Sequence, residues 1–223
     1  MHAAISRHYR ADCITYLDPT ASRIVAESEA IPMLPLRRTL IAYELAKQGD
    51  HRFISGHWPV DQAMLKKNAE NWSFMTILRD PVDRWLSNYF FNRHRQQDRD
   101  HFGTSLDLEA YLETSDAIEN GKLYLAFANG GNFPDGDPTK AMADAISVYK
   151  QFHLIGTMDD LDAFLDEFES RWHIRPQMEQ SNASPASRSD RDAALSQSVL
   201  QRIEDICAPD RAIYAAIRDH LRT

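Results

Sequence analysis

The hydrophobic pattern changes period within residues 72–91. Residues 72–78 are an almost continuous apolar run with β-branched members, which predicts a strand buried on both faces of a parallel sheet. From Pro81 onward the apolar residues recur at helical spacing, as Trp85, Leu86, Tyr89 and Phe90. Asp80 and Pro81 suit the N-cap and first position of that helix, because proline lacks only an N–H that would have no partner there. The pattern therefore predicts a buried strand followed directly by a capped helix.

The rest of the chain repeats this alternation of short apolar runs and amphipathic segments. Further strands are predicted at residues 12–18, 52–55 and 152–156. Helices are predicted at residues 1–10, 36–48, 61–71, 106–112, 117–128, 139–151, 159–171, 192–207 and 209–221. Residues 20–35 are expected to be a loop with a short helical piece, bounded by Pro32 and Pro35, and residues 129–138 are expected to be a loop. Together these elements predict an α/β fold with a mostly parallel sheet flanked by helices, in a single domain over residues 1–223.

Polar residues gather where the central strand gives way to its helix. Arg79 ends the strand, and Arg84 and Ser87 are three residues apart, so they can share one face of the helix. Open α/β sheets bind ligands at the carboxyl ends of their strands, and a helix start favours an anion. These three residues indicate a phosphate site. From residue chemistry alone, a structural ion pair between Arg79 and Asp83 is an equal alternative.

A histidine follows the predicted strand at residues 52–55, in the sequence Gly56-His57-Trp58-Pro59. Glycine lets the backbone turn sharply, and proline prevents the strand from continuing. His57 therefore stands at a strand end, where an imidazole can act as a general base because its ordinary pKa is close to the working pH. Without further information, a loop histidine bonded to backbone is the alternative.

Composition excludes several classes of function. The net charge of −8 argues against a general nucleic-acid-binding protein. The two cysteines, Cys13 and Cys207, have no metal-ligand spacing, so we expect reduced structural thiols and no metal. The sequence shows no apolar run long enough to span a bilayer and no signal peptide, which predicts a soluble, cytoplasmic protein.

Residues 77–84, ILRDPVDR, followed by Ser87, Tyr89 and Phe90, resemble the 3′-phosphate-binding segment of PAPS-dependent sulfotransferases. The resemblance is closest to the carbohydrate type related to the uronyl 2-O-sulfotransferases. In that family the arginine before Asp-Pro and the serine eight positions later hold the 3′-phosphate of the cofactor. The resemblance assigns these roles to Arg79 and Ser87, with Arg84 beside them as a further cofactor contact.

Two more segments extend the resemblance. The Gly-His pair resembles the segment that carries the proposed catalytic base of the uronyl-type enzymes, which makes His57 the candidate base. The polar segment 180–191 falls where related enzymes return a loop to the cofactor. It adds Asn182, Ser184 and Arg188 as candidate cofactor contacts, although each can also be a turn or capping residue.

The resemblance implies a three-layer fold like that of P-loop kinases. It also implies transfer of the sulfuryl group of PAPS (3′-phosphoadenosine 5′-phosphosulfate) to a hydroxyl of a carbohydrate or glycolipid, without a metal. The resemblance does not identify the particular acceptor molecule, the position that is sulfated, or the oligomeric state.

The family's Pro-Lys-x-Gly-Thr-Ser loop, which holds the 5′-phosphosulfate, does not occur in this sequence, and residues 1–10 resemble the helix that follows it. We therefore expect a domain without the first strand and its loop. A truncated enzyme is the preferred explanation, and a non-catalytic nucleotide-binding or scaffolding remnant is the alternative. A nucleotide kinase relative is disfavoured, because neither a Walker-type lysine nor a pair of magnesium-binding carboxylates can be placed.

Overall fold

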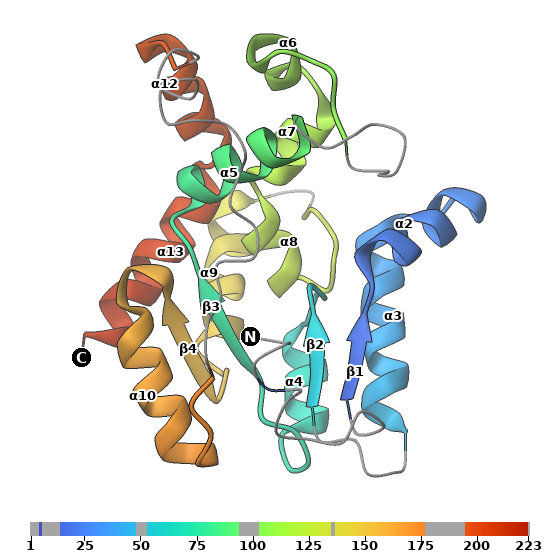
Figure 1. Ribbon diagram of the computed structural model, residues 1–223, viewed down its shortest axis with the longest axis vertical. Coiled ribbons are helices and arrows are strands. Elements are labelled where there is room, and N and C mark those ends of the chain that lie inside the picture. The colour runs from blue at the N-terminus through green and yellow to red at the C-terminus, as the bar shows by residue number, and fades with distance from the viewer. Residues whose placement is uncertain are drawn as a thin grey trace.

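The protein is a mixed α/β structure in which helices predominate and the described strands form two small parallel sheets (Figure 1). The computed structural model describes residue 5 and residues 14–47, 53–93, 103–134, 137–176 and 195–222. β1 (Ile14–Leu17) pairs with β2 (Phe53–Gly56), and β3 (Met75–Leu78) pairs with β4 (Leu154–Thr157). Figure 1 shows all four strands running in one direction, with β2 and β3 as neighbours. Their carboxyl ends therefore lie at the same edge of the strands.

The predicted mostly parallel sheet is correct in direction, but the described strands form two pairs instead of one continuous sheet. The apolar side chains nevertheless continue from one pair to the other. Ile54 of β2 belongs to the same core cluster as Leu78 of β3, and on the other face Phe53 belongs to the same cluster as Ile77. The two sheets thus share their cores, which holds the ends of β2 and β3 in a common frame.

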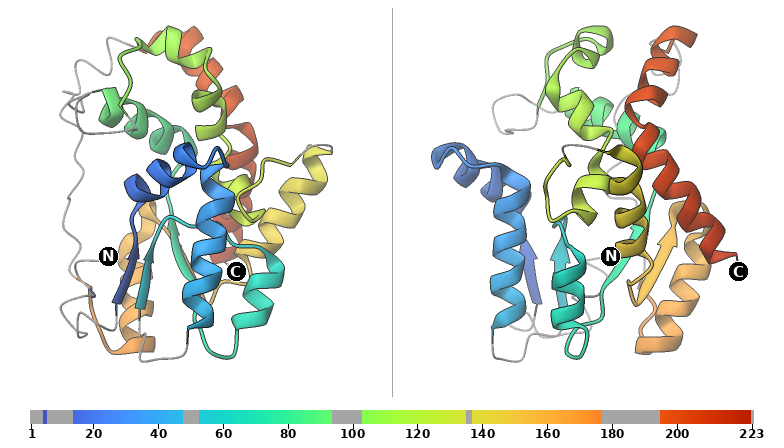
Figure 2. Two further views of the ribbon diagram at one scale, coloured as in Figure 1. Left: turned by 90° about the vertical axis from the view of Figure 1, so that its right-hand side faces the viewer. Right: turned by 180° about the vertical axis from the view of Figure 1, so that it is seen from behind.

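Helices cover both faces of the strands, as the side and rear views show (Figure 2). On one face the core joins the strands to α3 (Met33–Ala46), α4 (Gln62–Asn68), α8 (Leu123–Ala128), α9 (Pro138–Tyr149) and α13 (Ala208–Leu221). On the other face it joins them to α10 (Leu161–Trp172), which follows the short helix η2 (Met158–Asp160). No helix in the described ranges is both long enough and apolar enough to cross a bilayer.

A second helical cluster lies beyond the carboxyl end of β3. It contains α5 (Pro81–Arg93), α6 (Leu108–Leu112), α7 (Ser115–Asn120) and α12 (Gln197–Ile206). Trp85 is fully buried at its centre, stacks on Tyr89, and donates a hydrogen bond from its indole to the carbonyl of Ala117. The predicted apolar stripe of α5 therefore packs against this cluster.

The expectation of mostly loop at residues 20–35 is wrong. Asp18 caps α2 (Pro19–Ser28), because its carboxylate accepts hydrogen bonds from the N–H groups of Thr20 and Ala21 at 2.7 and 3.0 Å. Pro35 lies in the first turn of α3, where its missing N–H would have no partner in any case. Pro32 is the N-cap of α3 and Pro35 lies in its first turn, so both prolines mark the start of a helix.

The single helix predicted at residues 117–128 is divided into α7 and α8 at Gly121. A Cβ at Gly121 would lie 2.3 Å from the side chain of Ile206, so α12 packs directly on this backbone. The break matters for the site, because α7 carries Asn120 and α8 carries Tyr124.

Candidate active site

The junction between β3 and α5 has the predicted geometry. The Asp80 carboxylate accepts hydrogen bonds from the N–H groups of Val82 and Asp83 at 2.9 and 3.1 Å. Pro81 is buried at the first helical position. The start of α5 therefore follows the carboxyl end of β3 directly, and Asp80 occupies the N–H groups of Val82 and Asp83.

Arg79 is the residue between the strand and the cap, and its backbone is held by Tyr124 of α8. The Tyr124 hydroxyl accepts a hydrogen bond from the Arg79 N–H at 2.9 Å and donates one to the Arg79 carbonyl at 2.7 Å. Tyr124 is itself buried and donates its own N–H to Asp210 at 2.9 Å. The position of Arg79 is therefore set from the interior of the protein.

The side chain of Arg79 has no such partner. It is half-buried, and its guanidinium forms no hydrogen bond or ion pair with any residue that the structure describes. The alternative ion pair between Arg79 and Asp83 is not formed. Ser87, half-buried two turns into α5, also has no hydrogen-bond partner for its hydroxyl within the described ranges. The two predicted anchors of the 3′-phosphate are thus both available to a ligand.

Arg84 is placed differently, because internal partners engage its guanidinium. It donates to the Asn120 side chain at 2.9 Å and to the Asn120 carbonyl, and it forms an ion pair with Asp210 at 3.5 Å. It also lies 5.2 Å from the centre of the Tyr124 ring. We therefore interpret Arg84 as a structural residue that joins α5 to α7, α8 and α13, and we do not carry its predicted cofactor contact into the proposed site.

Asp210 completes this internal network. It is fully buried on α13, and its two carboxylate oxygens accept hydrogen bonds from the N–H groups of Tyr124 and Leu125 at 2.9 and 3.0 Å. Burial raises the pKa of this carboxyl to about 6, although Arg84 and the backbone donors of α8 favour its charged form. Sequence reasoning missed the link between Asp210 and α8, because 86 residues separate Asp210 from Tyr124.

His57 follows β2 as predicted, at a sharp turn where Gly56 has φ +144°. Its imidazole is exposed to solvent, yet the surrounding protein atoms lower its pKa below 6.5 by desolvation, and the positive charges of Arg37 and Arg84 lower it further. The neutral imidazole, which can accept a proton, is therefore favoured.

Backbone hydrogen bonds hold the segment that follows His57. The Val60 N–H donates to the carbonyl of Phe127 at 2.7 Å, and the Gly130 N–H donates to the carbonyl of Val60 at 2.9 Å. Arg38 of α3 pairs with Asp61, at 2.5 Å between Nη2 and Oδ2, and Asp61 caps α4. His57 is thus carried by a well-anchored loop.

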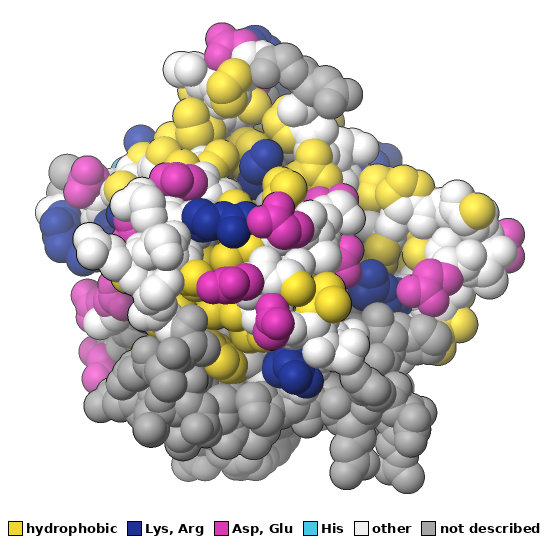
Figure 3. Space-filling view, turned by 90° about the horizontal axis from the view of Figure 1, so that it is seen from above, with side chains coloured by type: hydrophobic (Ala, Val, Ile, Leu, Met, Phe, Trp, Pro, Cys, Tyr) yellow, Lys and Arg dark blue, Asp and Glu magenta, His cyan; other side chains and the backbone are white. Residues whose placement is uncertain are grey.

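The remaining predicted cofactor contacts, Asn182, Ser184 and Arg188, lie outside the described residues. On the face seen from above, basic and acidic side chains of the described residues are interspersed (Figure 3). Among the predicted arginines of the α5 junction, Arg79 is distinguished from Arg84 by its lack of a partner in the described structure.

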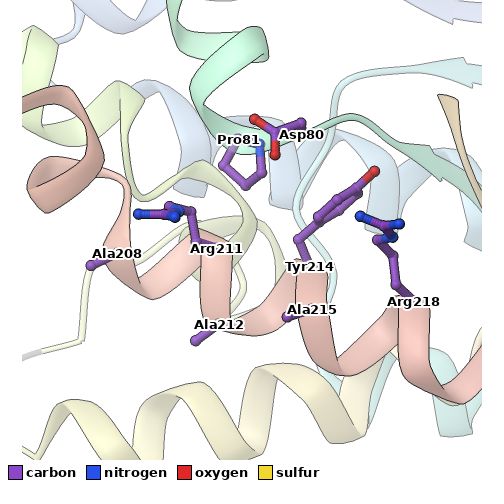
Figure 4. A pocket seen from close by; sticks show the side chains of 8 residues that line it. All are labelled: Asp80, Pro81, Ala208, Arg211, Ala212, Tyr214, Ala215 and Arg218. Atoms are coloured by element: carbon purple, nitrogen blue, oxygen red, sulfur yellow. The ribbon is translucent and has the colours of Figure 1, made fainter. Parts of the chain in front are cut away.

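A hollow of about 450 Å³ adjoins the α5 cap on the side of α13 (Figure 4). Its lining includes Asp80 and Pro81 from the cap, and Arg211, Tyr214 and Arg218 from α13. Both arginines already have acidic partners, since Arg211 lies 3.6 Å from Glu204 and Arg218 lies 3.7 Å from Asp159. None of the predicted site residues lines this hollow, so we do not assign the cofactor to it.

No protein-family model matches the sequence, and no curated protein matches it either. The resemblance to the sulfotransferases therefore rests on residues 77–90 and on the Gly56-His57 pair. Within the described ranges, no group of three or more His, Cys, Asp and Glu side chains is arranged to hold a metal ion.

Proposed function

We propose that this protein is a PAPS-dependent O-sulfotransferase of the carbohydrate type, similar to the uronyl 2-O-sulfotransferases, with the three-layer sulfotransferase fold. The observation that carries the proposal is the pair formed by Arg79 and Ser87. Both side chains lack a protein partner in the described structure. Arg79 stands where a parallel strand passes into a capped helix, and Ser87 lies two turns into that helix. Unpaired donors beside a helix start suit a phosphate group.

The properties of Arg79 fit the 3′-phosphate of PAPS. A guanidinium offers five N–H donors in a planar fork that matches phosphate oxygens, and partial burial strengthens such charge-assisted hydrogen bonds. The Tyr124 hydroxyl fixes the backbone of Arg79, so the fork starts from a defined position. Ser87 supplies a hydroxyl donor from α5, the helix that follows Arg79.

The proposed reaction is an in-line transfer of the sulfuryl group. The oxygen of the acceptor hydroxyl forms a bond to sulfur while the bond between sulfur and the 5′-phosphate oxygen breaks, and its electron pair stays on the 5′-phosphate of PAP, the desulfated product. The hydroxyl proton passes to the neutral imidazole of His57. Correct positioning and a matched base supply most of the rate in such a transfer. The acceptor is a hydroxyl of a carbohydrate or glycolipid.

A second candidate is a nucleotide-binding or scaffolding module without turnover. It uses the same unpaired Arg79 and Ser87 side chains as the first candidate and differs from it only in lacking turnover. Binding of PAP without transfer of sulfate from PAPS to any of a set of glycans would favour this module over the enzyme.

Calorimetric titration of PAP tests the shared part of both candidates. We expect saturable binding that Arg79→Ala weakens by roughly 10- to 100-fold, the loss expected for charged hydrogen bonds. The matched control is Arg171→Ala, because Arg171 binds the carbonyl of His153 just before β4, at the opposite ends of the strands. Equal losses in the two variants, or no binding in the unmodified protein, would refute the assigned anchor.

Transfer of labelled sulfate from PAPS to glycans tests the catalytic part. His57→Ala should abolish turnover and leave the affinity for PAP nearly unchanged. Retained turnover in this variant would remove His57 from the role of base.

A further inference from the structure

Arg37 of α3 is one of the most deeply buried residues of the protein, with 1% of its surface exposed. Its guanidinium reaches the carboxyl ends of both strands of the first sheet. Nη2 donates to the carbonyl of Leu17 at 3.0 Å, and Nη1 donates to the carbonyl of Asp18 at 3.1 Å and to the Ser22 hydroxyl at 2.8 Å. Nε donates to the carbonyl of His57 at 2.5 Å. Four of its five N–H donors are therefore used, and one of them holds the candidate base.

No acid pairs with this buried cation in the described structure. The Asp18 carboxylate is close enough to favour the charged guanidinium, but it is engaged by the start of α2 and forms no ion pair with Arg37. Burying an ion without an opposite charge costs free energy of solvation, and hydrogen bonds to neutral acceptors compensate for only part of that cost. A cation kept under these conditions acts on whatever titratable group lies beside it.

The titratable groups close to it are Tyr16, Asp18 and His57. The charged residues that act on the imidazole are Arg37 from α3 and Arg84 from α5, and both disfavour a second positive charge. Arg84 is itself paired with Asp210, whereas Arg37 has no ion-pair partner among the described residues. Of the two arginines, Arg37 is the one with a hydrogen bond to His57, donated from Nε to the backbone carbonyl of His57.

We propose that Arg37 is the positioning residue of His57: its Nε hydrogen bond fixes the backbone that carries the imidazole, and its buried positive charge lies next to that backbone. The base role of His57 rests on the proposed function, but the link between Arg37 and His57 does not. Arg37 contacts neither the acceptor nor PAPS in this proposal, so it acts only through His57.

NMR titration of the His57 imidazole tests the link without cofactor or acceptor, with His57→Gln used to assign the signal. We expect the His57 pKa of the unmodified protein to lie below 6.5 and to rise in Arg37→Gln. The control is Arg202→Gln, which removes an arginine of α12 that pairs with Glu113, and it should leave the His57 pKa unchanged. A His57 pKa above 6.5 in the unmodified protein overturns the proposal, whether or not Arg37→Gln folds.

Arg37→Lys separates the two effects of the guanidinium. It keeps the charge and loses the planar fork, so the His57 pKa should stay low while kcat falls on the order of 10- to 100-fold with little change in KM, as for a displaced catalytic group. In Arg37→Gln the acid limb of the pH profile of kcat should move upward together with the His57 pKa. An unchanged His57 pKa in folded Arg37→Gln overturns the proposal.

The outcomes for the two proposals are distinguishable. A His57 pKa that responds to Arg37 in a protein that does not bind PAP supports the positioning role and refutes the sulfotransferase. If the protein turns over PAPS but the His57 pKa is the same with and without Arg37, the positioning role is refuted and the enzyme is supported.

Discussion

The Tyr124 hydroxyl binds both backbone polar groups of Arg79, accepting from its N–H and donating to its carbonyl. A residue of α8 therefore holds the junction between β3 and α5, although 45 residues separate the two partners. The consequence is that the Arg79 backbone is satisfied by the protein while its side chain is not. A rigid backbone beneath an unpaired guanidinium is the arrangement expected of an anchor for an anion.

Removal of this hydroxyl should weaken both stability and binding. Tyr124→Phe leaves the N–H and carbonyl of Arg79 without their partner, so we expect the free energy of unfolding to fall by about 1–3 kcal/mol. The affinity for PAP should fall as well, because the guanidinium no longer starts from a fixed position. Urea denaturation and calorimetry measure the two effects. Tyr43→Phe, the same change at a 64% exposed tyrosine, is the control, and an equal effect in both variants would contradict the assigned role.

Ser87→Ala should separate binding from stability. The Ser87 hydroxyl has no partner in the described structure, and alanine is the better helix former, so stability should stay constant or rise by up to about 0.5 kcal/mol. The affinity for PAP should fall by roughly 3- to 10-fold, as expected for one hydrogen bond. The control is Ser147→Ala on the exposed side of α9, which should leave PAP binding unchanged. Unchanged PAP affinity in Ser87→Ala would exclude a ligand contact at Ser87.

Substitution by methionine should have different effects at Arg84 and Arg79: it should lower stability at Arg84 and PAP binding at Arg79. Arg84→Met leaves the fully buried Asp210 without its ion pair, and we expect a loss of about 3–5 kcal/mol in the free energy of unfolding. Arg79→Met breaks no interaction with a described residue, so its stability should stay within about 0.5 kcal/mol while PAP binding is lost. Chemical denaturation of both variants measures the contrast. A large loss of stability in Arg79→Met would show that its side chain has a structural role.

Asp210 should make stability depend on pH. Its pKa in the folded protein is about 6, against an ordinary value of 3.8, so the folded state binds more protons than the unfolded state between these values. Stability from this group is therefore fully present below about pH 4 and is lost as pH rises through 6. Relative to Asp210→Asn, which does not titrate, the unmodified protein should lose about 3 kcal/mol across this window.

Urea denaturation of both proteins at pH 4 and pH 7 measures this difference. The opposite trend, with the unmodified protein gaining on Asp210→Asn as pH rises, would contradict it. That result would mean that Arg84 and the two backbone donors outweigh burial and keep the carboxyl pKa low.

The elements that sequence reasoning located well are those with local signals. The α5 helix begins as predicted because Asp80 and Pro81 act within one turn, and its buried stripe follows from helical spacing alone. The boundary at Gly121 was missed because the cause is a distant side chain, Ile206, packing on the glycine. Pro35 was misread because proline signals a loop or a first helical turn equally well.

The candidate site shows the same division. Sequence reasoning selected Arg79 and His57 by their place at strand ends, and the structure places both just after the carboxyl ends of parallel strands. It selected Ser87 by its helical spacing and by the resemblance, and the structure places it two turns into α5. It grouped Arg84 with them because the two side chains share a motif. The partners of Arg84 come from α7 and α13, so no pattern within the motif could reveal its internal role.

The sequence alone determined where the strands pass into helices and which polar residues stand at those junctions, because spacing and capping act over a few residues. Only the tertiary structure decided which arginine side chains have partners within the protein. Asp210 reaches Arg84 and the start of α8 from the far end of the chain, and Arg37 reaches the His57 carbonyl across 20 residues. Such pairings depend on how helices pack around the strands, and the local pattern of a chain does not encode that packing.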